Sequence, residues 1–127
     1  MFSLELELIE KFKENMHNVF IPKKINEEVP FFSRNIDMVI LNQSNEIISI
    51  EFKLNDIKGV LEQSSKCLLC SDYVYVCLPN KKIRKNTINR FKEYGIGVIV
   101  VDEKITILEK AKKSQKSFLK NKIRNYL

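Results

Sequence analysis

Two apolar runs separated by a short polar stretch form the clearest pattern in the chain. Residues 34–54 are rich in Ile, Val, Met and Phe, which favour β-strands. The polar stretch between the runs, Asn-Gln-Ser-Asn, is typical of a turn. The pattern therefore predicts an antiparallel hairpin centred on Ser44.

The register of this hairpin follows from the apolar positions. Residues directly opposite one another in an antiparallel pair project from the same face. A centre at Ser44 gives one wholly apolar face, with the pairs Ile36–Phe52, Met38–Ile50 and Ile40–Ile48. A slip of one residue would set apolar side chains against polar ones. The favoured register places Asp37 opposite Glu51, and Lys53, two residues further on, is expected on the same face.

These three charged residues interrupt runs that otherwise look buried. Burying a charge costs several kcal/mol unless something compensates it. Two carboxylates can hold a hard cation, and an ammonium can face a bound water or a phosphate. The alternative is a solvated ladder of ion pairs on an exposed sheet face. The same face also carries the apolar residues Val39, Leu41 and Ile47, which indicates that other parts of the protein cover it.

The remaining periodicities predict an α/β protein of one domain, residues 1–127. The strand–helix–strand order within residues 73–102 implies a parallel crossover. We therefore expect a mixed central sheet, an antiparallel meander plus parallel crossover strands, flanked by helices. The predicted elements besides the hairpin are a helix at 3–16 with Ser3 as its N-cap, a strand at 17–32 with a bend near Pro22, a helix from Asn55 or Asp56 to about 71, a strand at 73–79, a helix within 80–94, strands at 97–102 and 104–108, and a basic helical tail at about 110–127, helical from Ser114.

Asp37, followed by Glu51-Phe52-Lys53 on the next strand, resembles the core motif of the PD-(D/E)XK nucleases. The resemblance covers about residues 3–103. It implies a restriction endonuclease-like or Holliday junction resolvase-like core and an Mg²⁺- or Mn²⁺-dependent endonuclease that hydrolyses DNA phosphodiester bonds. In the implied site, Asp37, Glu51 and the backbone carbonyl of Phe52 hold the metal. Lys53 positions and activates the attacking water.

The same resemblance suggests weaker candidates. It implies that a glutamate of the first helix contributes to the catalytic site, with Glu5 favoured and Glu7, Glu10 and Glu14 as the alternatives, and that Glu28 is an accessory metal ligand. Gln63 corresponds to a glutamine whose amide contacts the site or the DNA backbone. Ordinary solvent-exposed side chains are the alternative for Glu5 and Gln63. The chain departs from the family pattern at Ile36, where a proline often stands, and at Cys67, where a subgroup has a tyrosine.

The net charge of +6 is unevenly distributed. Residues 104–127 hold eight Lys or Arg against the single acid Glu109, and residues 81–92 hold six basic residues and no acid. Basic segments beside an acidic metal site suit a polyanion such as DNA, although basic runs are often only solvated faces. The candidate DNA-binding residues are Lys81, Lys82, Arg84, Lys85, Arg90, Lys112, Lys113 and Lys116.

The three cysteines make a weak case for a metal centre. Cys67, Cys70 and Cys77 with the distant His17 form a poor set of four ligands. Small buried residues are the expected role, and an odd count argues against a secreted disulfide framework. No apolar run reaches transmembrane length and the N-terminal residues lack a signal-peptide pattern, so we expect a cytoplasmic protein without a membrane partner.

Two functions other than a nuclease stay open. One is a catalytically silent module that keeps the fold and binds nucleic acid or a protein partner. The other is a small structural or regulatory subunit whose basic tail drives assembly. If the chain is a nuclease that cuts both strands of a duplex, two copies are needed, so a homodimer is also expected.

Overall fold

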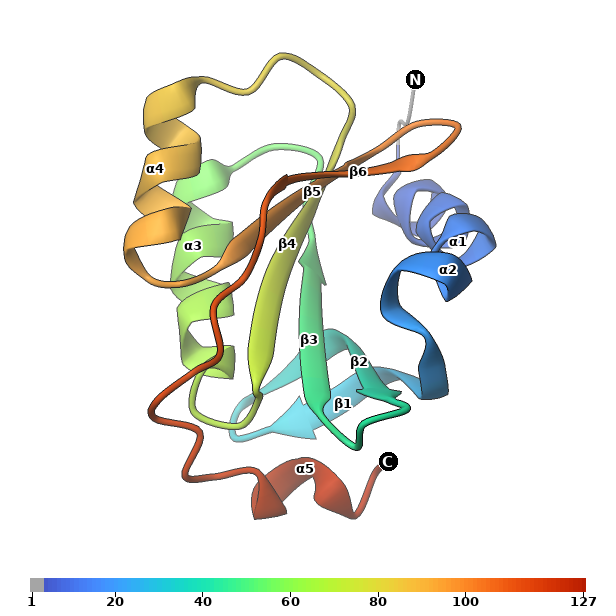
Figure 1. Ribbon diagram of the computed structural model, residues 1–127. Coiled ribbons are helices and arrows are strands. Elements are labelled where there is room, and N and C mark those ends of the chain that lie inside the picture. Colours follow the sequence, from blue (N-terminus) through green and yellow to red (C-terminus); the bar gives the residue numbers. More distant parts are fainter. Residues whose placement is uncertain (1–3) are drawn as a thin grey trace.

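A six-stranded mixed sheet forms the centre of the protein (Figure 1). The computed structural model describes residues 4–127. The strands, in their order across the sheet, are β1 (Pro22–Phe31), β2 (Arg34–Asn42), β3 (Ile47–Phe52), β4 (Tyr73–Pro79), β5 (Gly97–Val101) and β6 (Ile105–Glu109). β1, β2 and β3 form an antiparallel meander, β3, β4 and β5 are parallel, and β6 returns antiparallel to β5. The predicted α/β class, mixed sheet and parallel crossover are confirmed.

Helices cover both faces of the sheet. The helices are α1 (Glu5–Asn15), α2 (His17–Phe20), α3 (Ile57–Cys67), α4 (Lys85–Glu93) and α5 (Asn121–Arg124). Figure 1 shows α1 and α2 on one face and α3 and α4 on the other. Strand alternation divides the buried side chains accordingly: Met38, Ile50 and Phe52 pack toward α1, and Val39, Val76 and Val98 pack in the core on the side of α3 and α4.

The predicted hairpin register is present in the β2–β3 ladder. Met38 pairs with Ile50 and Ile40 pairs with Ile48. In the turn, the Asn42 side-chain oxygen accepts hydrogen bonds from the backbone N–H groups of Ser44 (3.0 Å) and Glu46 (2.8 Å). The apolar alternation and the polar turn therefore agree on one register.

Ile36 departs from the predicted apolar face. It is buried in the core on the α3 side, with Val29 and Phe31, and not with Met38. The β2–β3 ladder ends at Met38, so the start of β2 continues as a two-stranded ribbon with β1. Such ribbons twist strongly, which explains the changed direction of Ile36.

Helix boundaries follow local chemistry where the sequence supplies it. Asp56 is the N-cap of α3, and its side chain accepts a hydrogen bond from the Gly59 N–H at 3.2 Å. α3 ends at Cys67, before the predicted residue 71. Gly95 follows α4 with φ of +76°, the left-handed conformation that lets the chain turn into β5. The predicted N-cap Ser3 lies outside the described residues.

Two predicted elements are confirmed only in part, because tertiary contacts decide the rest of each. The strand predicted at residues 17–32 forms over Pro22–Phe31. Residues 17–20 form the short helix α2 instead of a strand, and Phe20 packs its ring against those of Phe12 and Tyr75. The tail is helical over Asn121–Arg124 alone. Its preceding residues are held by backbone bonds to the body, such as Leu119 N–H to the Leu69 carbonyl at 2.8 Å.

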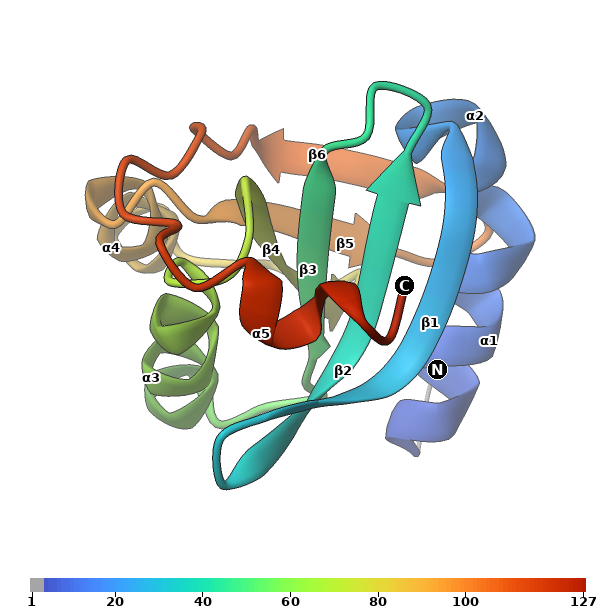
Figure 2. The ribbon, with the colours of Figure 1, turned by 90° about the horizontal axis from the view of Figure 1, so that it is seen from below.

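α5 packs against β1 at the end of the chain (Figure 2). Ile123 is fully buried there in the core on the α3 side. Within residues 4–127, no helix combines the length and the apolar character needed to cross a membrane.

Candidate functional site

Strands β2 and β3 separate at the end of their ladder, and two carboxyl groups lie in the split. The last backbone pair is Met38–Ile50. Beyond it, the Asp37 N–H donates to Oε2 of Glu51 at 3.2 Å, and the Phe52 N–H donates to Oδ2 of Asp37 at 2.9 Å. Side-chain oxygens thus take the place of backbone carbonyls as acceptors. The structure brings together the two acids that the sequence register places opposite one another.

Arg34 is the charged partner of this pair that sequence reasoning missed. Its Nη1 donates to Oε1 of Glu51 at 2.6 Å, and the Glu51 side chain has no solvent exposure. Charge-assisted hydrogen bonds of this kind are short and strong. The signal was present in the sequence, because a carboxylate buried in a strand requires a nearby cation and Arg34 opens the same strand as Asp37.

The electrostatics of the split favour a cation. Burial, together with the neighbouring Glu51 carboxylate, raises the pKa of Asp37 to about 7, although the Phe52 N–H and Arg34 act in the opposite direction. Two hard oxygen donors that repel one another are a donor set that Mg²⁺ or Mn²⁺ suits. Across residues 4–127, no three His, Cys, Asp or Glu side chains gather into a ready-made metal site. The acidic centre therefore consists of these two side chains.

Lys53 differs from its expected placement. Its Nζ lies 3.7 Å from Oε2 of Glu5 on α1, whereas Glu51 contacts Cys67 on α3, on the opposite face. In the described chain, neither Asp37 nor Glu51 is an ion-pair partner of Lys53. The reason is that β3 ends at Phe52, so the alternation of strand side chains no longer governs Lys53.

Glu5 therefore belongs to the surroundings of Lys53. It lies on α1, and its carboxylate pairs with this lysine. The Glu5 side chain is 44% exposed and that of Lys53 is 27% exposed. An ion pair with this exposure is weak and both groups can be released to a ligand.

Glu28 occupies a strained position beside Asp37. It lies on β1 between residues that pair with Met38 and Ile36, the two neighbours of Asp37. Its φ is +53°, a left-handed conformation that is uncommon for residues other than glycine. The side chain is exposed, and the structure shows no contact between it and either carboxyl group.

Gln63 reaches the site through its helix. It is partly exposed on α3, and its carbonyl accepts a hydrogen bond from Sγ of Cys67 at 3.7 Å. Cys67 Sγ also lies 3.9 Å from Oε1 of Glu51. Gln63 is thus one helical turn from the residue that contacts Glu51.

All three cysteines are buried, free thiols. Burial raises the pKa of Cys67, raises that of Cys70 to about 11, and raises that of Cys77. The thiolate is the nucleophilic and metal-binding form, so these groups behave as small core residues at neutral pH.

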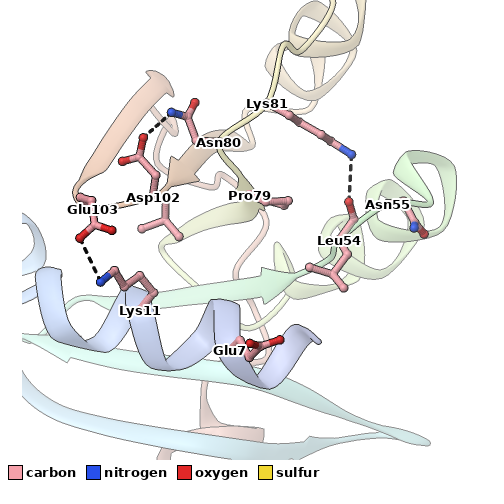
Figure 3. A pocket seen from close by; sticks show the side chains of 10 residues that line it. Glu7, Lys11, Leu54, Asn55, Pro79, Asn80, Lys81, Asp102 and Glu103 are labelled. Carbon is pink, nitrogen blue, oxygen red and sulfur yellow. Dashed lines mark hydrogen bonds and ion pairs between the residues drawn. The ribbon is translucent and has the colours of Figure 1, made fainter. Parts of the chain in front are cut away.

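A cavity of about 750 Å³ lies along α1 and is lined by Leu54, the residue that follows Lys53 (Figure 3). Lys81 closes one side by donating to the Leu54 carbonyl at 2.9 Å, and Lys11 pairs with Glu103 at 3.2 Å on another side. Its lining residues are Glu7, Lys11, Leu54, Asn55, Pro79, Asn80, Lys81, Val101, Asp102 and Glu103. They come from α1 and from the segments in which β3, β4 and β5 end.

The predicted DNA-binding side chains are all exposed and fall into two regions. Lys81, Lys82, Arg84 and Lys85 lie in the loop after β4 and at the start of α4, and Arg90 follows on that helix. Lys112, Lys113 and Lys116 lie together in a hollow beside the end of α4. Lys81 is the member of these groups that lines the cavity of Figure 3.

Comparison with known proteins supports the fold. No protein-family model and no curated protein sequence matches the chain. A protein of unknown function from Silicibacter pomeroyi has a similar structure, with a TM-score of 0.71, 15% identity, and coverage of 98% of this chain and 84% of that one. A repair endonuclease from Pyrococcus abyssi has a TM-score of 0.58 and 12% identity, with coverage of 81% of this chain and 49% of that one. About half of the repair endonuclease chain therefore has a fold similar to most of this one.

Proposed function

We propose that this protein is a metal-dependent nuclease of the PD-(D/E)XK type that hydrolyses DNA phosphodiester bonds. The observation that carries the proposal is the pair formed by the partly buried Asp37 and the buried Glu51 in the split between β2 and β3. The fold similarity to a repair endonuclease supports it. A carboxyl group such as Asp37, whose pKa is raised by burial and by a neighbouring carboxylate, is also typical of functional sites.

Asp37, Glu51 and the backbone carbonyl of Phe52 would hold one Mg²⁺ or Mn²⁺ ion, with Glu28 as an accessory ligand. The donor set fits, because it consists of hard oxygens whose mutual repulsion a divalent cation would relieve. The bound metal would supply Lewis-acid polarisation of the scissile phosphate and acidify a water molecule. Before metal binds, Arg34 compensates the charge of Glu51.

Lys53 would orient the attacking water and offset negative charge that develops on the phosphate in the transition state. Its ion pair with Glu5 is long at 3.7 Å and partly exposed, so the amine can turn from Glu5 to substrate. Glu5 would then act as the residue that positions Lys53, and Gln63 would contact the DNA backbone from α3.

DNA is the proposed partner. The exposed basic residues of the loop after β4, of α4 and of the tail would hold phosphates without reading bases. Cutting both strands of a duplex would need two active sites, which a homodimer would provide.

The test is a cleavage assay on single-stranded, duplex and branched DNA with Mg²⁺ or Mn²⁺. Asp37→Asn and Lys53→Ala are compared with Glu62→Gln and Lys58→Ala, which change exposed residues of α3. We expect cleavage by the wild type and by both control variants. We expect losses of at least about a hundredfold in the two site variants. Equal rates in all five proteins would contradict the proposed site.

A catalytically silent module that binds DNA is the second candidate. The Arg34–Glu51 ion pair and the turning of Lys53 toward Glu5 favour it, because both charges are compensated within the protein. Absence of cleavage on every substrate, with DNA binding retained, would select this alternative.

A further inference from the structure

We propose that the cavity along α1, which is lined by the residue that follows Lys53, binds one unpaired nucleobase of a DNA strand. The inference deepens the proposed function and rests on it, because it names the form of DNA that the nuclease would take. Figure 3 shows the cavity with its polar side chains arranged around Pro79.

The position of the cavity fits a ligand site next to the chemistry. Leu54 and Asn55 follow the end of β3, Asn80 follows β4, and Asp102 follows β5. In open α/β sheets, ligands bind beyond the carboxyl ends of parallel strands. Leu54 is also the residue after Lys53, so a base held here would leave its own phosphates near the lysine.

The walls combine an apolar surface with hydrogen-bond acceptors. Leu54 and Pro79 are partly exposed and offer apolar contact to the face of a base. Asp102 accepts hydrogen bonds from Nδ2 of Asn80 at 2.5 Å and from the Lys104 N–H at 3.1 Å. Each carboxylate oxygen can accept a further bond. The exocyclic amines of cytosine, adenine and guanine are donors of the matching kind.

A phosphate group fits the cavity poorly. Three acids, Glu7, Asp102 and Glu103, outnumber the two lysines of the lining. Lys11 is paired with Glu103, and Lys81 donates to the Leu54 carbonyl. A polyanion would therefore meet net negative charge, whereas a neutral base meets acceptors. The volume of about 750 Å³ lies in the range of small-ligand sites.

The consequence concerns substrate structure. A base inside a duplex is stacked and paired, so placing it in the cavity costs its stacking and pairing energy. A base in a single-stranded tail or at a branch loses much less stacking and pairing energy when it enters the cavity. The protein is therefore expected to prefer DNA with an unpaired segment over a blunt duplex.

The first experiment uses probes without DNA. The protein is titrated with deoxycytidine, thymidine and inorganic phosphate, and the backbone amide signals are followed by NMR. We expect deoxycytidine to shift the amides of residues 54–55, 80 and 101–103 and to bind about fivefold more tightly than thymidine, which lacks an exocyclic amine. Shifts of these amides by phosphate alone, or none by either nucleoside, would overturn the inference.

The second experiment measures binding, without divalent metal, to a blunt duplex and to the same duplex with a single-stranded tail. We expect the wild type to prefer the tailed DNA about tenfold. Asn55→Trp, at an exposed residue of the lining, should reduce the preference below about twofold while blunt-duplex affinity is kept. Asn121→Trp, an equal change at an exposed residue of α5, should keep it.

Failure of this inference differs from failure of the proposed function. If cleavage depends on Asp37 but Asn55→Trp keeps the wild-type preference for tailed DNA, the nuclease stands and the base pocket is wrong. If no metal supports cleavage but nucleoside binding and the Asn55→Trp effect are found, the pocket stands and the nuclease is wrong.

Discussion

Arg34 donates a 2.6 Å hydrogen bond from Nη1 to Oε1 of Glu51, a carboxylate with no solvent exposure. This contact explains how a strand residue that lies among apolar neighbours can keep its charge. A metal ion in the proposed site would therefore compete with the guanidinium for the same carboxylate.

Removal of the guanidinium is expected to destabilise the protein. Arg34→Ala leaves the buried Glu51 without its cation. Loss of one partner of a buried ion pair lowers the free energy of unfolding, and we expect about 3 kcal/mol here. This is the low end of the usual range, because Arg34 is 26% exposed. The free energy of unfolding, measured by urea denaturation, gives the value. The loss should be largely recovered by added Mn²⁺ if the metal takes the vacated place.

The matched control for this prediction is the double variant Arg34→Ala with Glu51→Gln. Because no buried charge is then left, the two changes together should cost clearly less than the sum of the single changes. Simple additivity would show that the ion pair contributes little to folding.

The pH dependence of stability should carry a signature of Asp37. Its pKa is raised to about 7 by burial and by Glu51, against about 3.9 in an unfolded chain. Between these values the folded protein holds a proton that the unfolded chain has lost. The free energy of unfolding should therefore fall as the pH rises through this window, and the contribution should level off above about pH 7.

Asp37→Asn should remove this part of the pH dependence and make the protein more stable than the wild type at about pH 8. Denaturation curves of both proteins from about pH 5 to pH 8 provide the measurement, with Glu62→Gln as the exposed control. A variant that keeps the full wild-type slope would rule out a raised pKa at Asp37.

The Glu5–Lys53 ion pair is expected to matter for activity more than for folding. Glu5→Gln should change the free energy of unfolding by less than about 1 kcal/mol, because the pair is partly exposed. If Glu5 positions Lys53, cleavage should fall about tenfold in the same variant. Glu10→Gln, which breaks a pair with Lys13 on the same helix, is the control.

If Glu5 acts through Lys53, the loss of cleavage caused by Glu5→Gln should vanish when Lys53→Ala is already present. An equal loss of cleavage in both backgrounds would show that Glu5 acts on its own or through the fold.

The sequence predicted the part of the site that strand alternation controls. The pairing of Met38 with Ile50 follows from the period of two, and it brings Asp37 beside Glu51. Lys53 could not be placed in this way, because the strand ends one residue earlier. Arg34 was missed because it opens its strand next to the polar Asn35, where no apolar period marks its direction.

The fold also divides into elements that local sequence patterns determine and elements that long-range contacts determine. β4, α4 and β5 were predictable because each has its own periodicity and end signals. The tail was not, because its shape depends on distant partners. Lys120 forms an ion pair with Asp72, whose side chain also accepts the Ile47 N–H at 2.8 Å. Isolated helical propensity has little weight beside such contacts.

The docking of the tail provides a further test. Ile123 is fully buried, so Ile123→Ala should lower the free energy of unfolding by about 2–4 kcal/mol. Phe118→Ala changes a side chain that is 79% exposed and should cost less than about 0.5 kcal/mol. Thermal or urea denaturation gives the free energy of unfolding of both variants. Equal stability of the two variants would mean that the tail does not dock on the body.

The most direct test of the proposed metal site is anomalous X-ray scattering from crystals grown with Mn²⁺. We expect a manganese peak in the split between β2 and β3, coordinated by carboxylate oxygens of both Asp37 and Glu51. Absence of a peak there, with the Arg34 guanidinium still bound to Glu51, would contradict the proposed metal site and the hydrolytic function that depends on it.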